Sequence, residues 1–250
     1  MLIDCHSHIH VDAFDSDRKE VIKRAQAAGV EKIINVGFDV EGNFKAIALA
    51  NEYDFIYATM GIHPHAASEW NEEVGEKIIE TCKCEPKVVA LGEMGLDYYK
   101  NFQPRELQLS VLRAQLAIAQ KLELPVIIHC RDAFNDLFEM LPHFQLKNVL
   151  LHCFTGTLEE ARVGWSRGYY MAFTGIITYP SAGSLREVFR GCPINLMVAE
   201  TDCPYLPPIP NRGKRNEPAF LRDTVSYMMS LRKDVDSSIL SANSIKLFSL

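Results

Sequence analysis

Short apolar segments recur along the whole chain and predict its strands. Their starts lie roughly 20 to 40 residues apart, which is farther than the 8–12 residues typical of hairpin-connected strands. The eight segments are Leu2–Ile3, Lys32–Val36, Phe55–Met60, Lys87–Leu91, Pro125–Ile128, Asn148–Leu151, Tyr169–Phe173 and Ile194–Ala199. Segments this apolar are typical of strands buried on both faces, as in parallel sheets whose strands alternate with helices.

The stretches between these segments carry helical patterns. Residues 104–122 begin with a proline and repeat apolar residues at helical spacing, which predicts a helix. Thr157–Glu160 and Ser184–Glu187 both have the sequence of a capping box, so each predicts the start of a helix. Residues 223–250 predict two more helices.

Eight strand–helix units in 250 residues predict a (β/α)8 TIM barrel in which residues 1–250 form a single domain. The alternative is an open, doubly wound parallel sheet. That fold typically carries a glycine-rich phosphate loop after its first strand, and the sequence has none there. No linker, low-complexity segment or internal repeat divides the chain.

Composition narrows the classes of protein further. The chain has 26 Lys and Arg against 32 Asp and Glu, for a formal net charge of −6. This argues against a protein held on nucleic acid or on a membrane by bulk positive charge, but it leaves a local basic site open. No apolar stretch approaches the ~20 residues that span a bilayer. The N-terminus also lacks a signal-peptide pattern, and seven cysteines suit reduced thiols, so we expect a cytoplasmic protein without membrane contact.

Histidine and acidic side chains suited to catalysis follow six of the eight segments, at the strand ends where barrel enzymes build their active sites, and five of these segments supply candidate metal ligands. The candidate ligands are His6, His8, Glu93, His129, His152 and Asp202. His6 and His8 are two residues apart, so they face the same side of a strand. One such histidine is equally compatible with a hydrogen-bonded structural role, but the combination favours metal binding. Six ligands suit two ions that share a carboxylate, for which Glu93 is the candidate because its strand is central in the set.

Several motifs together resemble those of TatD-type metal-dependent deoxyribonucleases, in the same order. They are Met1–His8, Gly61–His65, Gly92–Asp97, His129–Ala133, His152–Gly156, Glu200–Leu206 and Arg212–Pro218. The resemblance extends to about residue 220 and is weaker in the last helices. His10 departs from the family pattern, and we interpret it as a loop histidine rather than as a further ligand.

The resemblance implies a TIM barrel of the amidohydrolase-like kind with a two-metal hydrolytic site. It implies that His6, His8, Glu93 and Asp202 hold one ion and that Glu93, His129 and His152 hold the other. A related branch of metal hydrolases bridges its ions with a carbamylated lysine on the fourth strand. Glu93 occupies the matching position here, which favours the TatD-like assignment over a dihydroorotase-like or urease-like one.

For phosphodiester hydrolysis we expect a water activated by the two metals, with Asp202 acting as its proton acceptor or only as a ligand. Glu200 shares the face of Asp202 but lies deeper, which favours a supporting role. His63 is a candidate for contacting the substrate or for donating to the leaving group. The candidate phosphate contacts are Arg131, Arg212, Lys214 and Arg215, for which a surface salt bridge or a solvated loop is the alternative.

The favoured function is a deoxyribonuclease that trims DNA ends, with 3′-to-5′ digestion of single strands as the family expectation. One alternative is a metallohydrolase of another ester or amide, such as a lactone, a small phosphoester or an aminoacyl-tRNA ester, because the same metal pair would serve. A non-catalytic binding module is disfavoured by the complete ligand set. The sequence leaves open whether the two divalent ions are Mg²⁺, Mn²⁺ or Zn²⁺.

Overall fold

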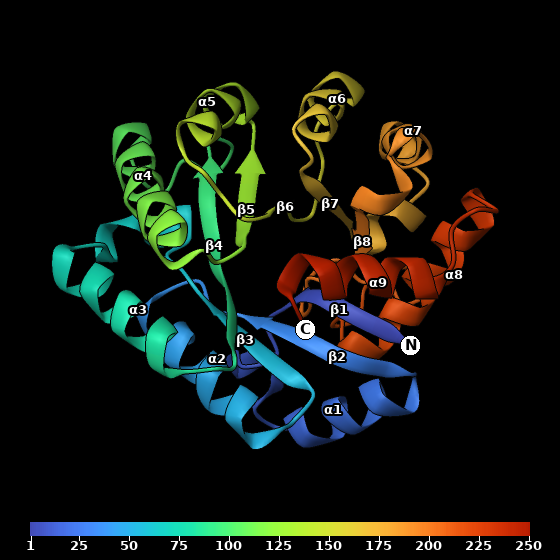
Figure 1. Ribbon diagram of the computed structural model, residues 1–250. Helices are drawn as coiled ribbons and strands as arrows, with labels where there is room; N and C mark the ends of the chain where they lie inside the picture. The colour runs from blue at the N-terminus through green and yellow to red at the C-terminus, as the bar shows by residue number, and fades with distance from the viewer.

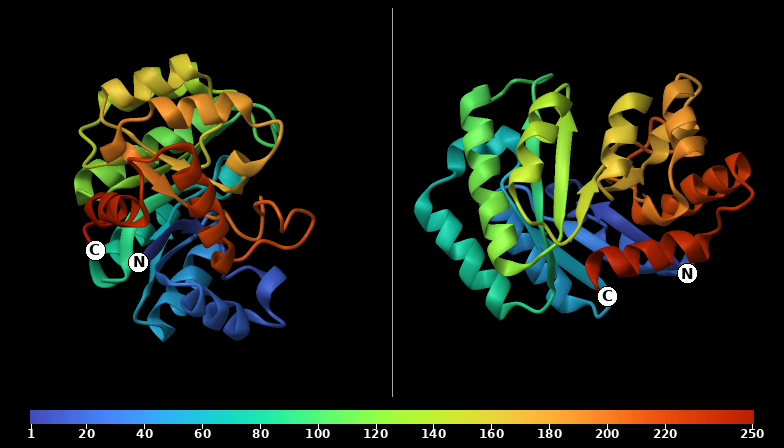
Figure 2. Two further views of the ribbon diagram at one scale, coloured as in Figure 1. Left: turned by 90° about the vertical axis from the view of Figure 1, so that its right-hand side faces the viewer. Right: turned by 45° about the horizontal axis from the view of Figure 1, so that its top comes forward.

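The computed structural model describes all 250 residues and contains one parallel sheet of eight strands wound into a barrel (Figures 1 and 2). The strands are β1 (Leu2–Ser7), β2 (Val30–Val36), β3 (Ile56–Met60), β4 (Val88–Asp97), β5 (Val126–Arg131), β6 (Val149–Leu151), β7 (Tyr170–Phe173) and β8 (Met197–Ala199). Each strand pairs with the next in chain order. This confirms the predicted TIM barrel, because a doubly wound sheet would reverse its strand order.

Helices surround the sheet on its outer face (Figure 1). They are α1 (Arg18–Ala27), α2 (Val40–Glu52), α3 (Glu72–Cys84), α4 (Arg105–Leu122), α5 (Phe134–Met140), α6 (Leu158–Ser166), α7 (Gly183–Gly191), α8 (Leu221–Leu231) and α9 (Ser237–Phe248). The 3-10 turns are η1 (Asp12–Phe14), η2 (Pro64–Glu69), η3 (Leu141–His143), η4 (Gly175–Thr178), η5 (Ile194–Leu196) and η6 (Pro218–Phe220). None of the helices combines the length and the apolar composition needed to cross a bilayer.

All eight apolar segments contribute to strands, and one prediction needs correction. The last segment was expected to be extended from Ile194 onwards. Residues 194–196 instead form the turn η5, and the strand begins only at Met197. The backbone N–H of Leu196 donates to the carbonyl oxygen of Pro193 at 2.9 Å, so the chain turns once before it enters the sheet.

The barrel interior and the interface between the sheet and the helices form separate apolar clusters of 12 and 56 buried residues. The inner cluster takes its side chains from the strands and from Leu247 and Phe248 at the end of α9. The side-chain amide of Asn148, which lies just before β6, donates to the carbonyl oxygen of Leu247 at 2.9 Å. Helix α9 therefore covers the N-terminal end of the barrel, and the opposite end is left for polar side chains.

The seam between β1 and β8 is closed by a side chain rather than by a regular ladder. The buried carboxylate of Asp4 accepts hydrogen bonds from the backbone N–H of Thr201 at 2.8 Å and from its hydroxyl at 2.6 Å. Beyond this contact, the N–H of Asp202 donates to the carbonyl oxygen of His6 at 2.9 Å. The seam thus fixes the ends of β1 and β8 next to each other, where two of the predicted metal-binding segments meet.

Only one of the two predicted capping boxes forms. At the start of α6, the hydroxyl of Thr157 accepts from the N–H of Glu160 at 3.2 Å, and the Glu160 carboxylate accepts from the N–H of Thr157 at 2.6 Å. The prediction for Ser184 was wrong, because α7 begins two residues earlier than that cap requires and its N-cap is Ala182. The carbonyl oxygen of Ala182 already accepts from the N–H of Arg186, which leaves the Ser184 hydroxyl inside the first turn.

This difference gives a matched pair of variants. Thr157→Ala should lower the free energy of unfolding by about 1 kcal/mol, because the first turn of α6 loses its side-chain acceptor. Ser184→Ala should change it by less than about 0.5 kcal/mol, because this exposed hydroxyl caps nothing. Urea denaturation of both variants measures the two values, and equal losses would contradict the assigned caps.

Candidate metal centre

All six predicted ligands lie together at the C-terminal ends of the strands. They are His6 on β1, His8 just after it, Glu93 on β4, His129 on β5, His152 just after β6 and Asp202 just after β8. Three overlapping groups have ligand atoms within 4.8 Å of one another. These groups are His6, His152 and Asp202; His6, His8 and Glu93; and His63, Glu93 and His129.

Irregularities in β1 and β4 aim two of these side chains. Between Asp4 and Ser7, β1 advances three residues while β2 advances two, and the same mismatch occurs between Leu91 and Met94 as β4 runs along β5. Each mismatch is a β-bulge, which inserts one residue and turns its neighbours relative to the sheet. His6 and Glu93 lie within these two bulged segments, so the same distortion points both side chains into the mouth.

Glycine is required immediately after the second bulge. Gly95 has a φ of +153°, and a Cβ there would lie 1.8 Å from the carbonyl oxygen of His129. No other residue would allow β4 to approach β5 this closely. The approach brings Glu93 against the imidazole of His129.

One half of the centre is formed by His6, His8 and Asp202. The Nδ1 of His8 lies 2.7 Å from the carbonyl oxygen of Val36, which can only accept. Neutral His8 therefore carries its hydrogen on Nδ1 and turns the lone pair of Nε2 toward the centre, 3.0 Å from the Nε2 of His6. The carboxylate oxygen Oδ1 of Asp202 lies 3.6 Å from the Nε2 of His6 and 3.5 Å from that of His8. The expectation that His6 and His8 point together is confirmed.

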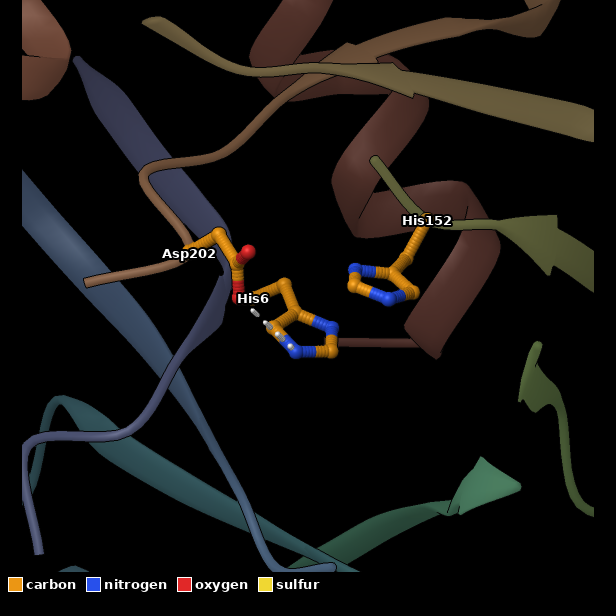
Figure 3. Close-up of side chains that lie close together, drawn as sticks. All are labelled: His6, His152 and Asp202. Atoms are coloured by element: carbon orange, nitrogen blue, oxygen red, sulfur yellow. Dashed lines mark ion pairs between the residues drawn. The ribbon is translucent and has the colours of Figure 1, made fainter. Parts of the chain in front are cut away.

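Figure 3 shows how this half meets the other. The imidazole of His6 lies between the carboxylate of Asp202 and the imidazole of His152. The two rings stack with centroids 4.0 Å apart and an interplanar angle of 13°. Side chains from β1, from the segment after β6 and from the segment after β8 thus converge on one small volume.

The other half is formed by His129 and His152. The Nδ1 of His129 lies 3.0 Å from the Oε1 of Glu93, and the Nε2 of His152 lies 2.8 Å from the same oxygen. The opposite ring nitrogens face two further carboxylates, because the Nε2 of His129 lies 3.2 Å from Asp97 and the Nδ1 of His152 lies 3.5 Å from Glu200. Such outer carboxylates fix the tautomer and the orientation of a histidine ligand.

Glu93 contacts both halves through different oxygens. Its Oε1 faces His129 and His152, as described above. Its Oε2 lies 3.4 Å from the Nε2 of His6 and 3.6 Å from that of His8. One carboxylate that directs its two oxygens at two pairs of imidazoles has the arrangement that a shared ligand of two cations needs.

The electrostatics of the centre fit divalent cations. Burial raises the pKa of the Glu93 carboxyl, but the neighbouring His152 and His63 lower it more, so its pKa is well below the usual range. Burial and the nearby His152 lower the pKa of His6 to about 3. Near pH 7 the centre therefore presents an ionised carboxylate beside a neutral imidazole, which are the protonation states that metal ligands need.

The pKa of His152 is shifted in the opposite direction to that of His6, and this shift is also consistent with a bound cation. Burial lowers its pKa, but the neighbouring carboxylates of Glu93 and Glu200 raise it well above the usual value. The buried acids thus attract positive charge to this ring. A divalent cation would supply that charge in place of the proton.

Comparison with known proteins agrees with this geometry. A family model described as TatD related DNase matches residues 3–249. The chain belongs to the TatD-related DNase family. It is therefore a metal-dependent hydrolase, as the sequence motifs implied.

Relatives and solved structures of the TatD family match over nearly the whole chain. The chain is 41% identical over 253 residues to the uncharacterized metal-dependent hydrolase YabD of Bacillus subtilis, with 99% of each chain covered. It is 37% identical over 257 residues to the 3′-5′ ssDNA/RNA exonuclease TatD of Cronobacter sakazakii, with coverages of 99% and 97%. The crystal structure of the TatD homologue YjjV from Escherichia coli matches with a TM-score of 0.94 and 31% identity, covering 100% of this chain and 98% of that one.

His63 lies beside the centre but is placed as a hydrogen-bond donor. Its Nδ1 accepts from the backbone N–H of His65 at 3.1 Å, so in the neutral ring the hydrogen lies on Nε2. That Nε2 faces the Oε1 of Glu93 at 3.4 Å. Burial lowers the pKa of His63 to about 4, which keeps the ring neutral. A nitrogen that carries its hydrogen cannot ligate, so this position suits the predicted contact with substrate better than metal binding.

The predicted phosphate contacts fall into two groups. Arg131 and Arg212 lie over the rings of Tyr99 and Tyr179, with distances of 3.8 Å and 4.6 Å from the guanidinium carbon to the ring centroid. Arg215 instead pairs with Asp17 at 2.7 Å and donates to the carbonyl oxygen of residue 13. Arg215 therefore ties its loop to the segment before α1, and its contact with substrate stays a prediction.

Two further residues lie near the centre: His10 is in the turn after β1, as interpreted from the sequence, whereas the position of Asp97 was not anticipated. His10 is buried, with Nδ1 3.0 Å from the Oδ1 of Asn35, and it lies outside the ligand groups. Asp97 received no role in the sequence analysis, although it ends one of the recognised motifs. Its Oδ2 lies near His129, as above, and 2.9 Å from the Nε2 of His65. The sequence feature that could have indicated this role is the position of Asp97, four residues after the predicted ligand Glu93 on the same segment.

Asp97→Ala should weaken metal binding about 10- to 100-fold, because His129 loses the carboxylate that fixes its tautomer and ring orientation. Asp132→Ala is the matched control, since Asp132 is an exposed acid that follows the same strand as His129. Calorimetric titration of each chelator-treated variant with Mn²⁺ and Zn²⁺ measures the affinities. Equal affinities for Asp97→Ala and the unmodified protein would contradict the orienting role.

Proposed function

We propose that this protein is a two-metal exonuclease that removes nucleotides from the 3′ ends of single-stranded DNA and RNA. The observation that carries the two-metal part is Glu93, whose oxygens face two separate pairs of histidines. The substrate part is supported by the TatD exonuclease of Cronobacter sakazakii, which is 37% identical over nearly the full length of both chains. The proposed ligands are the six residues predicted from the sequence.

Bound divalent ions would supply Lewis acidity at the phosphoryl oxygens and a lowered pKa for the attacking water. The chain's own residues supply the remaining steps. Burial raises the pKa of Asp202, but the neighbouring imidazoles of His8, His6 and His152 lower it more, so Asp202 is ionised. As an ionised carboxylate at the mouth, Asp202 is able to accept the proton of the water.

His63 supplies the complementary donor. Its Nε2–H points into the centre beside Glu93, and its side chain is 12% exposed, so a substrate oxygen is able to reach it. A neutral donor at this place would hydrogen-bond the leaving oxygen or an oxygen of the phosphoryl group. Asp202 would thus accept the proton of the water, and His63 would donate a hydrogen bond to the substrate.

The charge distribution supports binding at chain ends. The protein carries a formal net charge of −6, so its surface as a whole does not attract a polyanion. Arg131 is the last residue of β5, at the mouth, and Arg212 lies on the loop after β8. A polyanion is therefore attracted only where its end reaches the centre, as an enzyme that trims ends requires.

The test is a panel of short, 5′-labelled oligonucleotides digested with Mg²⁺, Mn²⁺ or Zn²⁺. We expect linear single strands to shorten from the 3′ end, a 3′-blocked strand to be digested more slowly and circular single strands to persist. A chelator should abolish the reaction. Cleavage of circles at the same rate would contradict an exonuclease, and hydrolysis confined to lactones, aminoacyl esters or small phosphoesters would favour the alternative hydrolase.

Variants link this activity to the centre. Asp202→Asn should lower kcat by about 10²- to 10⁴-fold, because the proton acceptor is lost. His143→Ala is a control for substitutions at the centre, since this exposed histidine belongs to the turn η3. Single-turnover digestion of the linear strand measures both variants. Retention of full activity by Asp202→Asn would overturn its role.

A further inference from the structure

Exposed aromatic side chains gather at the mouth of the barrel. Four aromatic residues of the chain are classed as exposed, and three of them follow β4 or β8. Tyr99 and Phe102 lie between β4 and α4 with 58% and 64% exposure, and Tyr205 follows β8 with 57%. The fourth, Phe44, belongs to α2 on the outside of the barrel. Large aromatic rings left open to water beside a reactive centre indicate a binding surface.

Phe102 packs against a histidine that lies beside the metal centre. Its ring contacts that of His65, with centroids 4.7 Å apart and an angle of 65°. His65 in turn contacts Asp97, the carboxylate next to His129. The side-chain amide of Gln103 donates to the carbonyl oxygen of His65 at 3.3 Å, which ties the loop down. The ring is thus fixed on one side, and most of its surface faces solvent.

Tyr205 lies close to the other half of the centre. Its ring centroid is 6.4 Å from that of His8. Its backbone N–H donates to the carbonyl oxygen of Asp202 at 3.0 Å, and its own carbonyl oxygen accepts from the side-chain amide of the buried Asn216 at 2.6 Å. These bonds fix the backbone of Tyr205 relative to the ligand Asp202.

Phe102 follows β4 and Tyr205 follows β8, and three strands separate β4 from β8 in either direction around the eight-stranded barrel, so the two rings lie across the mouth from each other. We propose that Phe102 and Tyr205 stack on the nucleobases of the nucleotides on either side of the phosphodiester that is cleaved. This proposal rests on the proposed function and specifies how its substrate is held.

The chemistry around the rings fits a nucleic-acid strand. Arg131 lies over Tyr99 at 3.8 Å, and the amine of Lys100 lies 5.8 Å from the same ring, so positive charge accompanies the aromatic surface after β4. A nucleic-acid strand has flat bases that stack on aromatic rings and negatively charged phosphates that pair with cations, so it is complementary to this surface. Single rings on opposite sides of the centre also suit flat ligands better than they suit a protein surface, which would need a continuous apolar patch.

The stacking has a consequence for selectivity. Aromatic rings stack on every base, so the sequence of the strand should matter little. Bases inside a duplex already stack on their neighbours and are paired, so they cannot place a ring on each side of one phosphate without unpairing. The two rings would therefore select unpaired ends.

The proposal is tested by combining substitutions of the aromatic residues with removal of single bases from the substrate. Phe102→Ala and Tyr205→Ala are compared with Phe44→Ala, which removes an exposed ring far from the centre. Phe102→Tyr and Tyr205→Phe test whether a ring is sufficient. Each protein is assayed on intact single strands and on strands with one abasic site, placed at successive positions from the 3′ end.

On intact strands, each alanine variant at the mouth should lower kcat/KM by roughly 5- to 150-fold, the range for one stacked base. The loss should nearly vanish when the abasic site occupies the position that the ring stacks on, and this position should differ between the two variants. The conservative variants and Phe44→Ala should match the wild-type protein on every strand.

Equal losses on intact and abasic strands at every position would overturn the stacking proposal while leaving the exonuclease in place. A wild-type protein that digests no single strand would overturn the proposed function itself. The two failures are therefore distinguishable by the wild-type digestion alone.

Discussion

The site depends on one buried carboxylate. Glu93 is only 4% exposed, yet its pKa is held well below the usual range, so it remains charged in a place where charge is costly. The cost is offset by imidazoles on both sides, and metal ions at those positions would offset it further. The bulge in β4, Gly95 and the outer acids Asp97 and Glu200 all serve to place Glu93 or the rings it faces.

The buried charge of the metal centre and the apolar packing that stabilises the fold lie in different parts of the barrel. Apolar side chains fill the interior below the centre, and Leu247 and Phe248 of α9 complete that filling at the N-terminal end. The seam formed by Asp4 and Thr201 lies between the apolar interior and the ligands. The strands are thus stabilised by apolar packing away from the centre. The polar residues at their C-terminal ends therefore do not need to stabilise the fold and can take part in the reaction.

The sequence predicted the features that follow from local pattern. Apolar segments marked all eight strands, and the two-residue spacing of His6 and His8 placed both rings on one side. Features that depend on contacts between distant segments were not predictable. The position of Asp97 beside His129 depends on the register of β4 against β5, the pairing of Arg215 depends on Asp17, almost 200 residues away, and the missing cap at Ser184 depends on where the chain before α7 turns.

The sharing of Glu93 by two metal ions is tested by counting the ions that each chain binds. Elemental analysis of the protein after exposure to Mn²⁺ and removal of excess ion, combined with anomalous diffraction from the same preparation, counts and locates the ions. We predict two ions per chain, one on either side of Glu93, and loss of both in Glu93→Gln. A single ion per chain, or two ions that persist in Glu93→Gln, would contradict this prediction.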